Sequence, residues 1–429
     1  MDYLSAVRWL YGLEPRGIRL ELDRLRAVLA LRGEPQRGLR VVHVAGTNGK
    51  GSVSAMVAAA LRASGLRVGL YTSPHLHRFV ERVRVDGRVL AERALAQRVT
   101  ELRAFLERPG VPPLTFFEVA TLLALEVFRD ARVDVAVLEV GLGGRLDATN
   151  VIDAPLVTTI TRIARDHEAY LGTTIAAIAG EKAGIAKHGV PLVVGARDPE
   201  AQAAIRERAE KVGATPVRWL GTDISVSDVG EPRFSVQVGD DVVSALRVGL
   251  AGAHQRDNAV LAVATLITLR TRGVEVSDDA IRRGVAGVRW PGRLESAQRG
   301  GVRYLFDAAH NPDGCVALGA HLATLPRKRK RALLFAAMSD KDHAPMLAAL
   351  APHFDAIVYT RPNTPRAAEP EALAAHAPGE CVRDVAAALA RAQRLAGKGG
   401  EVVVAGSIYL LAEARALVLG VRTEPPIAM

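Results

Sequence analysis

The stretch 43–52, HVAGTNGKGS, combines glycines, a lysine and hydroxyl side chains in a pattern typical of phosphate-binding loops. Backbone N–H groups at the start of a helix bind phosphate, because they have no partner within the helix and because the helix dipole favours negative charge. Lys50 would place a positive charge on the β- and γ-phosphates of a nucleotide, and the hydroxyl of Ser52 would reach a Mg²⁺ ion. The stretch therefore predicts nucleotide binding.

The spacing of this loop differs from the common pattern G-x-x-x-x-G-K-[ST]. Gly46 and Gly49 are three residues apart, and Gly51 separates the lysine from the serine. The flanks suit a phosphate loop, because residues 41–45 are predicted to form a strand and residues 53–63 a helix. On spacing alone, a plain glycine-rich turn stays open as the alternative.

A carboxylate stands at the end of another predicted strand. Residues 133–140 form a continuous β-rich run, as expected of a buried parallel strand, and Glu139 precedes a glycine-rich turn at 141–144. The carboxyl ends of such strands border the crevice where doubly wound folds bind ligands. Glu139 is therefore a candidate oxygen ligand for Mg²⁺, with capping of the glycine turn as the alternative.

Two further candidates follow the predicted strand 156–163. Asp166 and His167 come directly after it, again at the carboxyl end of a strand. The segment GEKAGIAK contains Lys182 and Lys187 in a chain with few lysines. A lone histidine is usually structural, and a lysine can extend from a helix to solvent along its apolar stem. The position of His167 at a strand end, beside two other candidate ligands, favours a functional site. A lysine inside an Ala/Gly-rich segment of a chain with so few lysines calls for an explanation of its own.

A chain of 429 residues exceeds the size at which one hydrophobic core keeps growing, so two domains are expected. Strand-like and helix-like segments alternate before and after a break at 289–293, RWPGR, which predicts two α/β domains with largely parallel sheets. The predicted fold is a P-loop-containing doubly wound ATPase domain, residues 1–292, followed by a smaller Rossmann-like α/β domain, residues 293–429. The expected strands are 41–45, 66–72, 133–140, 156–163, 190–194, 304–307, 331–338, 355–360 and 401–406, with a hairpin at 234–250 and helices at 53–63, 116–128 and 254–272.

The composition argues against several classes of protein. The sequence has no run of eighteen uncharged apolar residues and no secretory signal, so we expect a cytoplasmic protein without a membrane partner. The net charge of +10 comes mainly from arginine, since only eight of the 56 basic residues are lysines. The run 327–331, RKRKR, is interpreted as a solvated loop, with an anion or nucleic-acid patch as the alternative. Cys315 and Cys381 form neither a disulfide framework nor a zinc pattern.

Ten motifs occur along the chain in a fixed order: AGTNGKGS, YTSPHL, LTFFEVAT, EVGLGGRLDATN, DHEAYLG, EKAGIAK, HQRDNA, PGRLE, DAAHNP and AGSIYL. Together they resemble the Mur ligase superfamily, and within it the folylpolyglutamate synthase and dihydrofolate synthase branch. The resemblance covers about residues 40 to 410, and the stretches GLGGRLDATN and TFFE are specific to the folate branch. The shortened phosphate loop is the normal form in this family.

The resemblance implies ligands for ATP and for two Mg²⁺ ions. The ATP phosphates would be bound by Thr47, Asn48, Gly49, Lys50, Gly51 and Ser52. One Mg²⁺ would be held by Ser52 and Glu139, with Ser73 nearby. The second would be held by Glu139, His167 and a carbamylated Lys182. A neutral lysine that adds CO₂ becomes an anionic oxygen ligand, which suits a hard cation.

The resemblance also implies where the substrates lie. The residues expected to line the pterin and benzoate pocket are Phe117, Arg145, Leu146 and Asp147. Those expected to touch the base, phosphate and ribose of the nucleotide are Asn258, Arg293 and Asp307. Those expected on the glutamate side are Asp307, His310 and Ser407. One departure is that Arg162 and Arg165 precede the Asp-His pair, where the family usually has TNIGLDH.

The implied activity is that of an ATP-dependent ligase that adds L-glutamate to dihydropteroate, and further L-glutamates to the γ-carboxyl of reduced folates, through an acyl phosphate. The expected partners are these small molecules, and the expected state is a monomer. An enzyme that only extends glutamate tails stays open, since the choice depends on the pterin pocket and on residues 17–24. A cell-wall Mur ligase is a weaker alternative, because the motifs are of the folate type. In addition, the loop begins by residue 46, which is expected to leave no room for a UDP-binding domain ahead of it. A P-loop switch would not require Glu139, His167 and Lys182 together, and a nucleic-acid binder would show a reader module.

Overall fold

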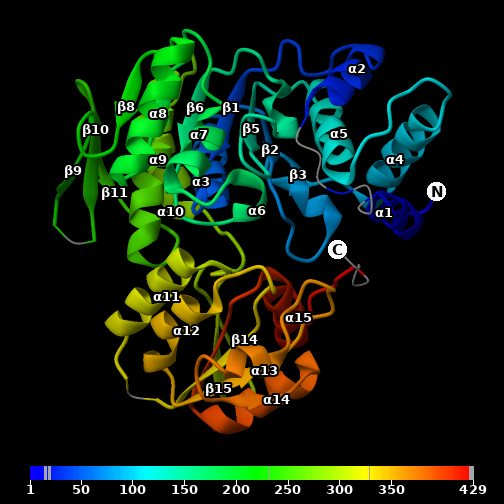
Figure 1. Cartoon of the computed structure of the whole chain (residues 1–429). Helices are drawn as coiled ribbons and strands as arrows, with labels where there is room; N and C mark the ends of the chain where they lie inside the picture. The colour runs from blue at the N-terminus through cyan, green and yellow to red at the C-terminus, as the bar shows by residue number, and fades with distance from the viewer. Residues whose placement is uncertain (14–16, 18–20, 231, 328, 425–429) are drawn as a thin grey trace. The chain divides into compact units, whose positions relative to one another are not determined.

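The computed structural model describes residues 1–13, 17, 21–230, 232–327 and 329–424. The region 17–24, on which substrate choice was expected to depend, therefore lies partly outside the described residues. The chain divides into two compact units, each with its own α/β architecture (Figure 1). Unit 1 comprises Met1–His75, Phe79–Gly249 and Gln255–Val288, and unit 2 comprises Leu76–Arg78, Leu250–His254 and Arg289–Met429.

The centre of unit 1 is an eight-stranded sheet with the strand order β4-β3-β2-β5-β1-β6-β7-β8. Its strands are β1 Val41–Ala45, β2 Val68–Tyr71, β3 Val83–Val85, β4 Arg88–Val89, β5 Val135–Glu139, β6 Val157–Ile160, β7 Leu192–Val194 and β8 Val217–Trp219. All pairings are parallel except those that β3 makes with β2 and β4. Every residue of β1, β5 and β6 is buried, which explains their continuous apolar sequences.

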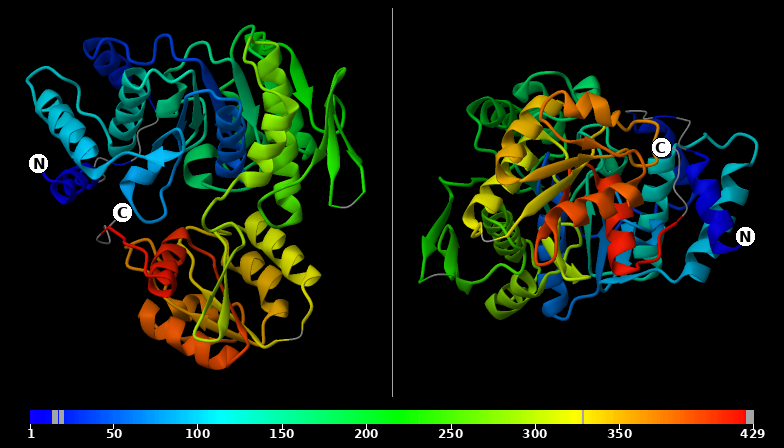
Figure 2. Two further views of the ribbon diagram at one scale, coloured as in Figure 1. Left: turned by 180° about the vertical axis from the view of Figure 1, so that it is seen from behind. Right: turned by 90° about the horizontal axis from the view of Figure 1, so that it is seen from below.

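Helices cover both faces of this sheet (Figure 2). Successive strand residues point to opposite faces. On one face, the hydroxyl of Thr159 bonds that of Thr265 on α9 at 2.9 Å, and on the other, Ile160 joins the core formed with α7 and α8. The helices of this unit are α1 Tyr3–Tyr11, α2 Asp23–Leu31, α3 Lys50–Ala63, α4 Glu92–Leu106, α5 Phe116–Asp130, α6 Glu168–Leu171, α7 Ile175–Ala183, α8 Pro199–Val212, α9 Ala253–Arg270 and α10 Asp278–Gly287. The first two residues of α9 fall in unit 2.

Local sequence determines where several helices begin. Thr115 and Glu118 form a reciprocal capping box at the start of α5. Asp198 caps α8, and Pro199 takes the first helical position, where a missing N–H costs nothing. A separate antiparallel sheet of unit 1 contains β9 Ile224–Asp228, β10 Phe234–Val238 and β11 Asp241–Leu246.

Unit 2 contains a six-stranded sheet with the order β12-β13-β17-β14-β15-β16, parallel except for β12. Its strands are β12 Glu295–Arg299, β13 Val302–Phe306, β14 Arg331–Phe335, β15 Ala356–Tyr359, β16 Glu380–Cys381 and β17 Glu401–Ala405. Its helices are α11 Pro312–Thr324, α12 His343–Leu350, α13 Pro370–Ala374, α14 Val385–Ala396 and α15 Ile408–Leu419. Leu333 packs with α11 and α12, whereas its neighbour Leu334 packs with α14 and α15, so both faces of the sheet are covered.

The predicted fold class and the predicted strands, helices and hairpin are confirmed, with ends that shift by a few residues. The interpretation of 327–331 as a solvated loop is wrong for Arg331, which is buried at the start of β14. Its Nε donates to Glu401 on β17 at 2.7 Å, and burial is tolerated because the two charges pair. Arg327, Arg329 and Lys330 are exposed, and residue 328 lies outside the described part. None of the helices in the described residues combines the length and apolar character that crossing a bilayer requires.

Candidate functional site

The loop between β1 and α3 is shaped by two glycines with positive φ. Gly46 has φ 144° and Gly49 has φ 92°, conformations that L side chains rarely adopt. A Cβ at Gly46 would overlap the hydroxyl of Thr161, and one at Gly49 would overlap the side-chain oxygen of Asn258. The glycines therefore serve both the turn and close packing, and Asn258 lies directly against the phosphate loop.

The loop is anchored to the chain that follows β6. The Thr47 N–H donates to the Arg162 carbonyl at 2.8 Å, and the Thr47 hydroxyl donates to the Ala164 carbonyl at 3.0 Å. The Thr161 hydroxyl donates to the Asn48 carbonyl at 2.7 Å. Arg162, which departs from the family pattern, thus contributes its backbone to holding the loop.

Two side chains of α3 lie at the mouth of this loop. The Lys50 ammonium donates to the carbonyls of Gly46 and Thr47, each at 3.0 Å, so it folds back over the loop. Ser52 is buried in the first turn of the helix, beside Gly51. The loop thus presents an ammonium, a hydroxyl and a helix N-terminus on one short segment, which suits a phosphate chain with its cation.

Glu139 is the last residue of β5, which pairs with β1 in the sheet. Its Cα lies in register with Val44, so the carboxylate emerges one strand away from the phosphate loop. The side chain is buried, and its Oε2 accepts a hydrogen bond from the Ser73 N–H at 3.2 Å. The structure therefore brings Ser73 to Glu139 through its backbone amide.

Lys182 is buried near the end of α7. Burial, with a smaller contribution from the positive charge of Lys50, lowers the pKa of its amine to about 7, although Asp166 and Asp147 act in the opposite direction. These interactions place Lys182 within electrostatic reach of the phosphate loop. An amine with this pKa is substantially neutral at pH 7, the form that reacts with CO₂.

Asp166 and His167 follow β6 as predicted. Asp166 is buried, while the His167 side chain is 37% exposed and its Nε2 lies 3.9 Å from Asp166 Oδ1. His167 has φ 54° and caps the short helix α6. Asp166 was predicted only as the neighbour of His167, but its burial and its effect on Lys182 make it part of the same cluster.

The donor set fits a hard cation whose coordination is completed by other oxygens. Within the described residues, no three His, Cys, Asp or Glu side chains gather closely enough to hold a metal by themselves. Mg²⁺ usually takes one or two carboxylates together with water and substrate phosphates. Glu139, the Ser52 hydroxyl and a lysine that can become a carbamate offer that kind of site.

The loop 141–150 lies beside Glu139 and Lys182. The ring of Phe117 packs against Gly141, where a Cβ would overlap it, and Gly144 lies against the backbone of Lys182. The exposed Arg145 pairs with Glu181 at 2.9 Å, and Leu146 is half-buried. Asp147 is buried, and its carboxylate accepts the N–H groups of Gly141 and Leu142. Asp147 therefore holds the loop together, a part that the sequence did not predict.

An aromatic cluster around His75 was also missed. Tyr11 stacks on Phe116 with ring centres 5.5 Å apart, and the Arg82 guanidinium lies 5.1 Å from the centre of the same ring. Arg82 donates from Nε to His75 Nδ1 at 2.9 Å, and His75 Nε2 lies 3.0 Å from the Tyr11 hydroxyl. His75 stands in the motif YTSPHL, which was the available signal.

The remaining predicted residues lie in unit 2, and all but Arg293 follow the carboxyl ends of two adjacent parallel strands, β13 and β17. Asp307 is buried and accepts the N–H groups of Leu294 and Ala309, both at 2.9 Å. His310 Nδ1 lies 2.8 Å from the Ala308 carbonyl. Ser407 caps α15, accepting the Tyr409 N–H. Arg293 is half-buried in the segment before β12.

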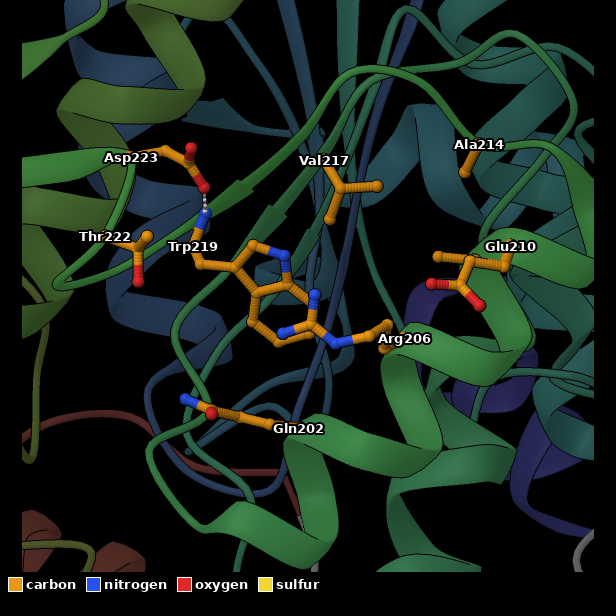
Figure 3. A pocket seen from close by; sticks show the side chains of 9 residues that line it. Gln202, Arg206, Glu210, Ala214, Val217, Trp219, Thr222 and Asp223 are labelled. Atoms are coloured by element: carbon orange, nitrogen blue, oxygen red, sulfur yellow. Dashed lines mark hydrogen bonds between the residues drawn. The ribbon is translucent and has the colours of Figure 1, made fainter.

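A separate cavity of about 400 Å³ lies in unit 1 between α8 and the end of β8 (Figure 3). The Arg206 guanidinium lies 4.8 Å from the centre of the Trp219 ring in this cavity. The described residues that line it are Gln202, Arg206, Ala209, Glu210, Ala214, Val217, Trp219, Thr222 and Asp223. None of them belongs to the predicted site.

Two family domains match the chain. The Mur ligase middle domain matches residues 44–266, and the Mur ligase glutamate ligase domain matches residues 292–408. The folylpolyglutamate synthase of Lacticaseibacillus casei is 36% identical to this chain, over 98% of the chain and 99% of the relative. The chain spans only about half the length of two relatives that are 39% identical, the probable bifunctional folylpolyglutamate synthase/dihydropteroate synthases of Haloferax volcanii and Halobacterium salinarum.

Solved structures of proteins from this family are also similar to the chain. The Escherichia coli FolC structure in complex with DHPP and ADP is similar with a TM-score of 0.87 and 35% identity, covering 98% of this chain and 99% of that one. A structure of a bifunctional folylpolyglutamate synthase/dihydrofolate synthase with Mn, AMPPNP and L-glutamate bound has a TM-score of 0.87 and 35% identity, covering 98% of this chain and all of that one.

Proposed function

The chain belongs to the folylpolyglutamate synthase/dihydrofolate synthase family of Mur ligases, and from this premise we propose that it is an ATP-dependent ligase that adds L-glutamate to dihydropteroate and to the γ-carboxyl of reduced folates. The observation that carries the proposal is the convergence of the phosphate loop, Glu139 and the buried, low-pKa Lys182 at one edge of the sheet of unit 1. A phosphate-binding turn alone would not require the last two.

The reaction follows from the weakness of a carboxylate as an acylating group. A carboxylate oxygen attacks the γ-phosphorus of ATP, ADP leaves, and an acyl phosphate forms. The amine of L-glutamate then attacks the acyl carbon, a proton is lost from nitrogen, and inorganic phosphate leaves as the amide forms. Phosphoryl transfer asks the protein mainly for positioning and charge neutralisation, and no covalent enzyme nucleophile is needed.

We assign the positioning of the ATP phosphates to the phosphate loop. The Thr47 and Asn48 N–H groups donate to the Arg162 carbonyl, so the backbone N–H groups of residues 49–51 would hold the phosphates. The Lys50 ammonium would turn from its own loop carbonyls toward the transferred group. Asn258, which touches Gly49, lies where it could contact the nucleotide. In unit 2, Arg293 and Asp307 are assigned to the phosphate and ribose.

Two Mg²⁺ ions are proposed beside the phosphates. Ser52 and Glu139, with Ser73 nearby, would hold one, and Glu139, His167 and carbamylated Lys182 would hold the other. When bound, the ions neutralise charge on the transferred phosphoryl group. The support is the donor set described above and the Mn in the related structure with AMPPNP.

The substrates are assigned by position. Phe117, Arg145, Leu146 and Asp147 are proposed to border the pterin and benzoate pocket in residues 1–292. His310 and Ser407 are proposed on the glutamate side in residues 293–429. There, the N-termini of α11 and α15 follow two adjacent strands, so their amides favour a carboxylate. We further propose a cytoplasmic monomer whose partners are these small molecules.

The second candidate is an enzyme that only extends glutamate tails. The full-length similarity to the Lacticaseibacillus casei protein, which is described as a folylpolyglutamate synthase, keeps it open. Either activity uses the same site chemistry, because both join a carboxylate to the amine of glutamate.

The test is ATP-dependent phosphate release by the purified protein with Mg²⁺ and L-glutamate, with dihydropteroate in one reaction and tetrahydrofolate in another. Turnover with both would establish the bifunctional ligase, and turnover with tetrahydrofolate alone would establish the tail-extending enzyme. Lys50→Met should abolish turnover, whereas Lys211→Met, at an exposed position of α8, should not. Folded protein that binds ATP but is inactive with both substrates would refute the proposal.

A further inference from the structure

His43 lies in the middle of β1, three residues before the phosphate loop, and is fully buried. Its neighbours Val42 and Val44 are apolar, as a buried parallel strand requires. A buried polar side chain is costly unless it is hydrogen-bonded. Burial lowers the pKa of His43 to about 3, so the imidazole is neutral at ordinary pH.

The hydrogen bonds around His43 define its tautomer. Its Nε2 lies 2.8 Å from the Thr149 hydroxyl oxygen, which in turn lies 2.5 Å from Asp147 Oδ1. A carboxylate can only accept, so the Thr149 hydroxyl donates to Asp147 and accepts from His43. His43 therefore carries its proton on Nε2. Its Nδ1 is buried and finds no hydrogen-bond partner among the described residues.

Hydrogen bonds of Asp147 extend this set to the backbone of the loop 141–150. Its Oδ1 also accepts the Thr149 N–H at 3.0 Å, and its Oδ2 accepts the N–H groups of Gly141 and Leu142 at 3.0 and 2.8 Å. Gly141 is two residues after Glu139 in the chain.

The other end of the loop rests on the helix that carries Lys182. Gly144 packs so closely that an added Cβ would lie 2.7 Å from the Lys182 carbonyl oxygen. The Arg145 N–H donates to the Glu181 carbonyl at 2.8 Å. A continuous set of hydrogen bonds thus runs from β1 to a loop that lies between Glu139 and Lys182.

We propose that His43 is a positioning residue of this site: through Thr149 and Asp147 it fixes the loop 141–147, and thereby the relative placement of Glu139 and Lys182. Its effect on turnover rests on the proposed ligase function, whereas its effect on the loop does not. We assign His43 no contact with the reacting groups. Its role is to donate one buried N–H to the Thr149 hydroxyl, and an aliphatic side chain at position 43 would leave that hydroxyl without a donor.

The experiment compares three variants. His43→Leu removes the donor, and His43→Gln keeps an amide N–H at roughly the position of imidazole Nε2. Thr158→Val is the matched control, since Thr158 is buried on the neighbouring strand β6 in register with His43, and its hydroxyl bonds the Pro191 carbonyl, away from the loop. The first readout is amide hydrogen exchange over residues 140–150. The second is nucleotide-dependent Mn²⁺ affinity, measured by electron paramagnetic resonance.

We expect exchange at Gly141 and Leu142 to be about tenfold faster in His43→Leu, since one buried hydrogen bond in the set is lost. Mn²⁺ affinity should fall by about tenfold, the lower end for loss of a group that orients metal ligands. His43→Gln and Thr158→Val should stay close to the parent protein in both measurements. In the turnover assay, His43→Leu should lower kcat more than it changes the KM for ATP.

The proposal is overturned if His43→Leu matches Thr158→Val in loop exchange and Mn²⁺ affinity, or if exchange rises equally throughout the protein. Should His43→Leu fail to fold, Thr149→Val breaks the same connection with a side chain of nearly the same shape and must give the same local change. Loop exchange and Mn²⁺ binding can be measured without turnover. A protein inactive in the ligase assay would therefore refute the proposed function and leave this inference to be decided separately.

Discussion

The low pKa of Lys182 makes a quantitative prediction about its reaction with CO₂. Burial, with a contribution from Lys50, lowers this pKa from the ordinary 10.5 to about 7. About half of the amine is then neutral at pH 7, compared with about one part in 3,000 for an ordinary lysine. Since only the neutral amine adds CO₂, Lys182 should react far faster than the other lysines.

The sign and size of the pH dependence follow from the same value. The neutral fraction of Lys182 rises as pH increases through 7, from about 10% at pH 6 to about 90% at pH 8. At a fixed concentration of dissolved CO₂, the initial rate of carbamate formation should therefore rise about tenfold over this interval and then level off. An ordinary lysine would show a rise of about a hundredfold with no plateau.

The assay is incubation of metal-free protein with ¹⁴C-labelled bicarbonate, trapping with triethyloxonium and peptide mapping. The label should map to Lys182 and disappear in Lys182→Arg. Lys187→Arg is the matched control, because Lys187 lies in the same segment, is partly buried and also has a lowered pKa. The Lys187→Arg variant should still be labelled at Lys182. Label spread over several lysines, or a hundredfold rise at Lys182 without a plateau, would refute the reasoning.

Three further predictions concern the loop, the metal and unit 2. Gly49→Ala should abolish ADP binding measured by calorimetry, because its Cβ would overlap Asn258, whereas Gly65→Ala, at a similar positive φ but in open space, should bind ADP normally. Glu139→Gln should abolish nucleotide-dependent Mn²⁺ binding in titrations but leave ADP affinity within about threefold, because the phosphates still bind the loop amides. An equal loss of Mn²⁺ binding and ADP affinity would contradict the role of Glu139 as a metal ligand. Glu401→Gln should cost about 3–5 kcal/mol in urea unfolding by leaving Arg331 buried and unpaired, and a cost below about 1 kcal/mol would show that the pair does not stabilise unit 2.

The sequence predicted those parts of the site that depend on short-range patterns. Glu139 was identified because an apolar run of strand length ended at a carboxylate, and parallel strands end at one edge of the sheet. The phosphate loop was identified from glycines and a lysine within ten residues.

Features that depend on how distant segments pack were not predicted. Arg331 was taken for a solvated residue because its partner Glu401 is 70 positions away and meets it only through the register of β14 and β17. The part that Asp147 plays depends on the loop folding back so that its carboxylate meets the amides of Gly141 and Leu142. Short strands at sheet edges, such as β4 and β16, contain two residues each and leave no periodic signal.

The most direct test of the central claim follows an oxygen atom through the reaction. The protein is supplied with ATP, Mg²⁺, L-glutamate and a pteroyl or folyl substrate in which both oxygens of the reacting carboxylate are ¹⁸O, and the released phosphate is analysed by mass spectrometry. An acyl phosphate predicts that each amide bond formed releases one phosphate that contains one substrate ¹⁸O. Amide formation with unlabelled phosphate would contradict the proposed mechanism.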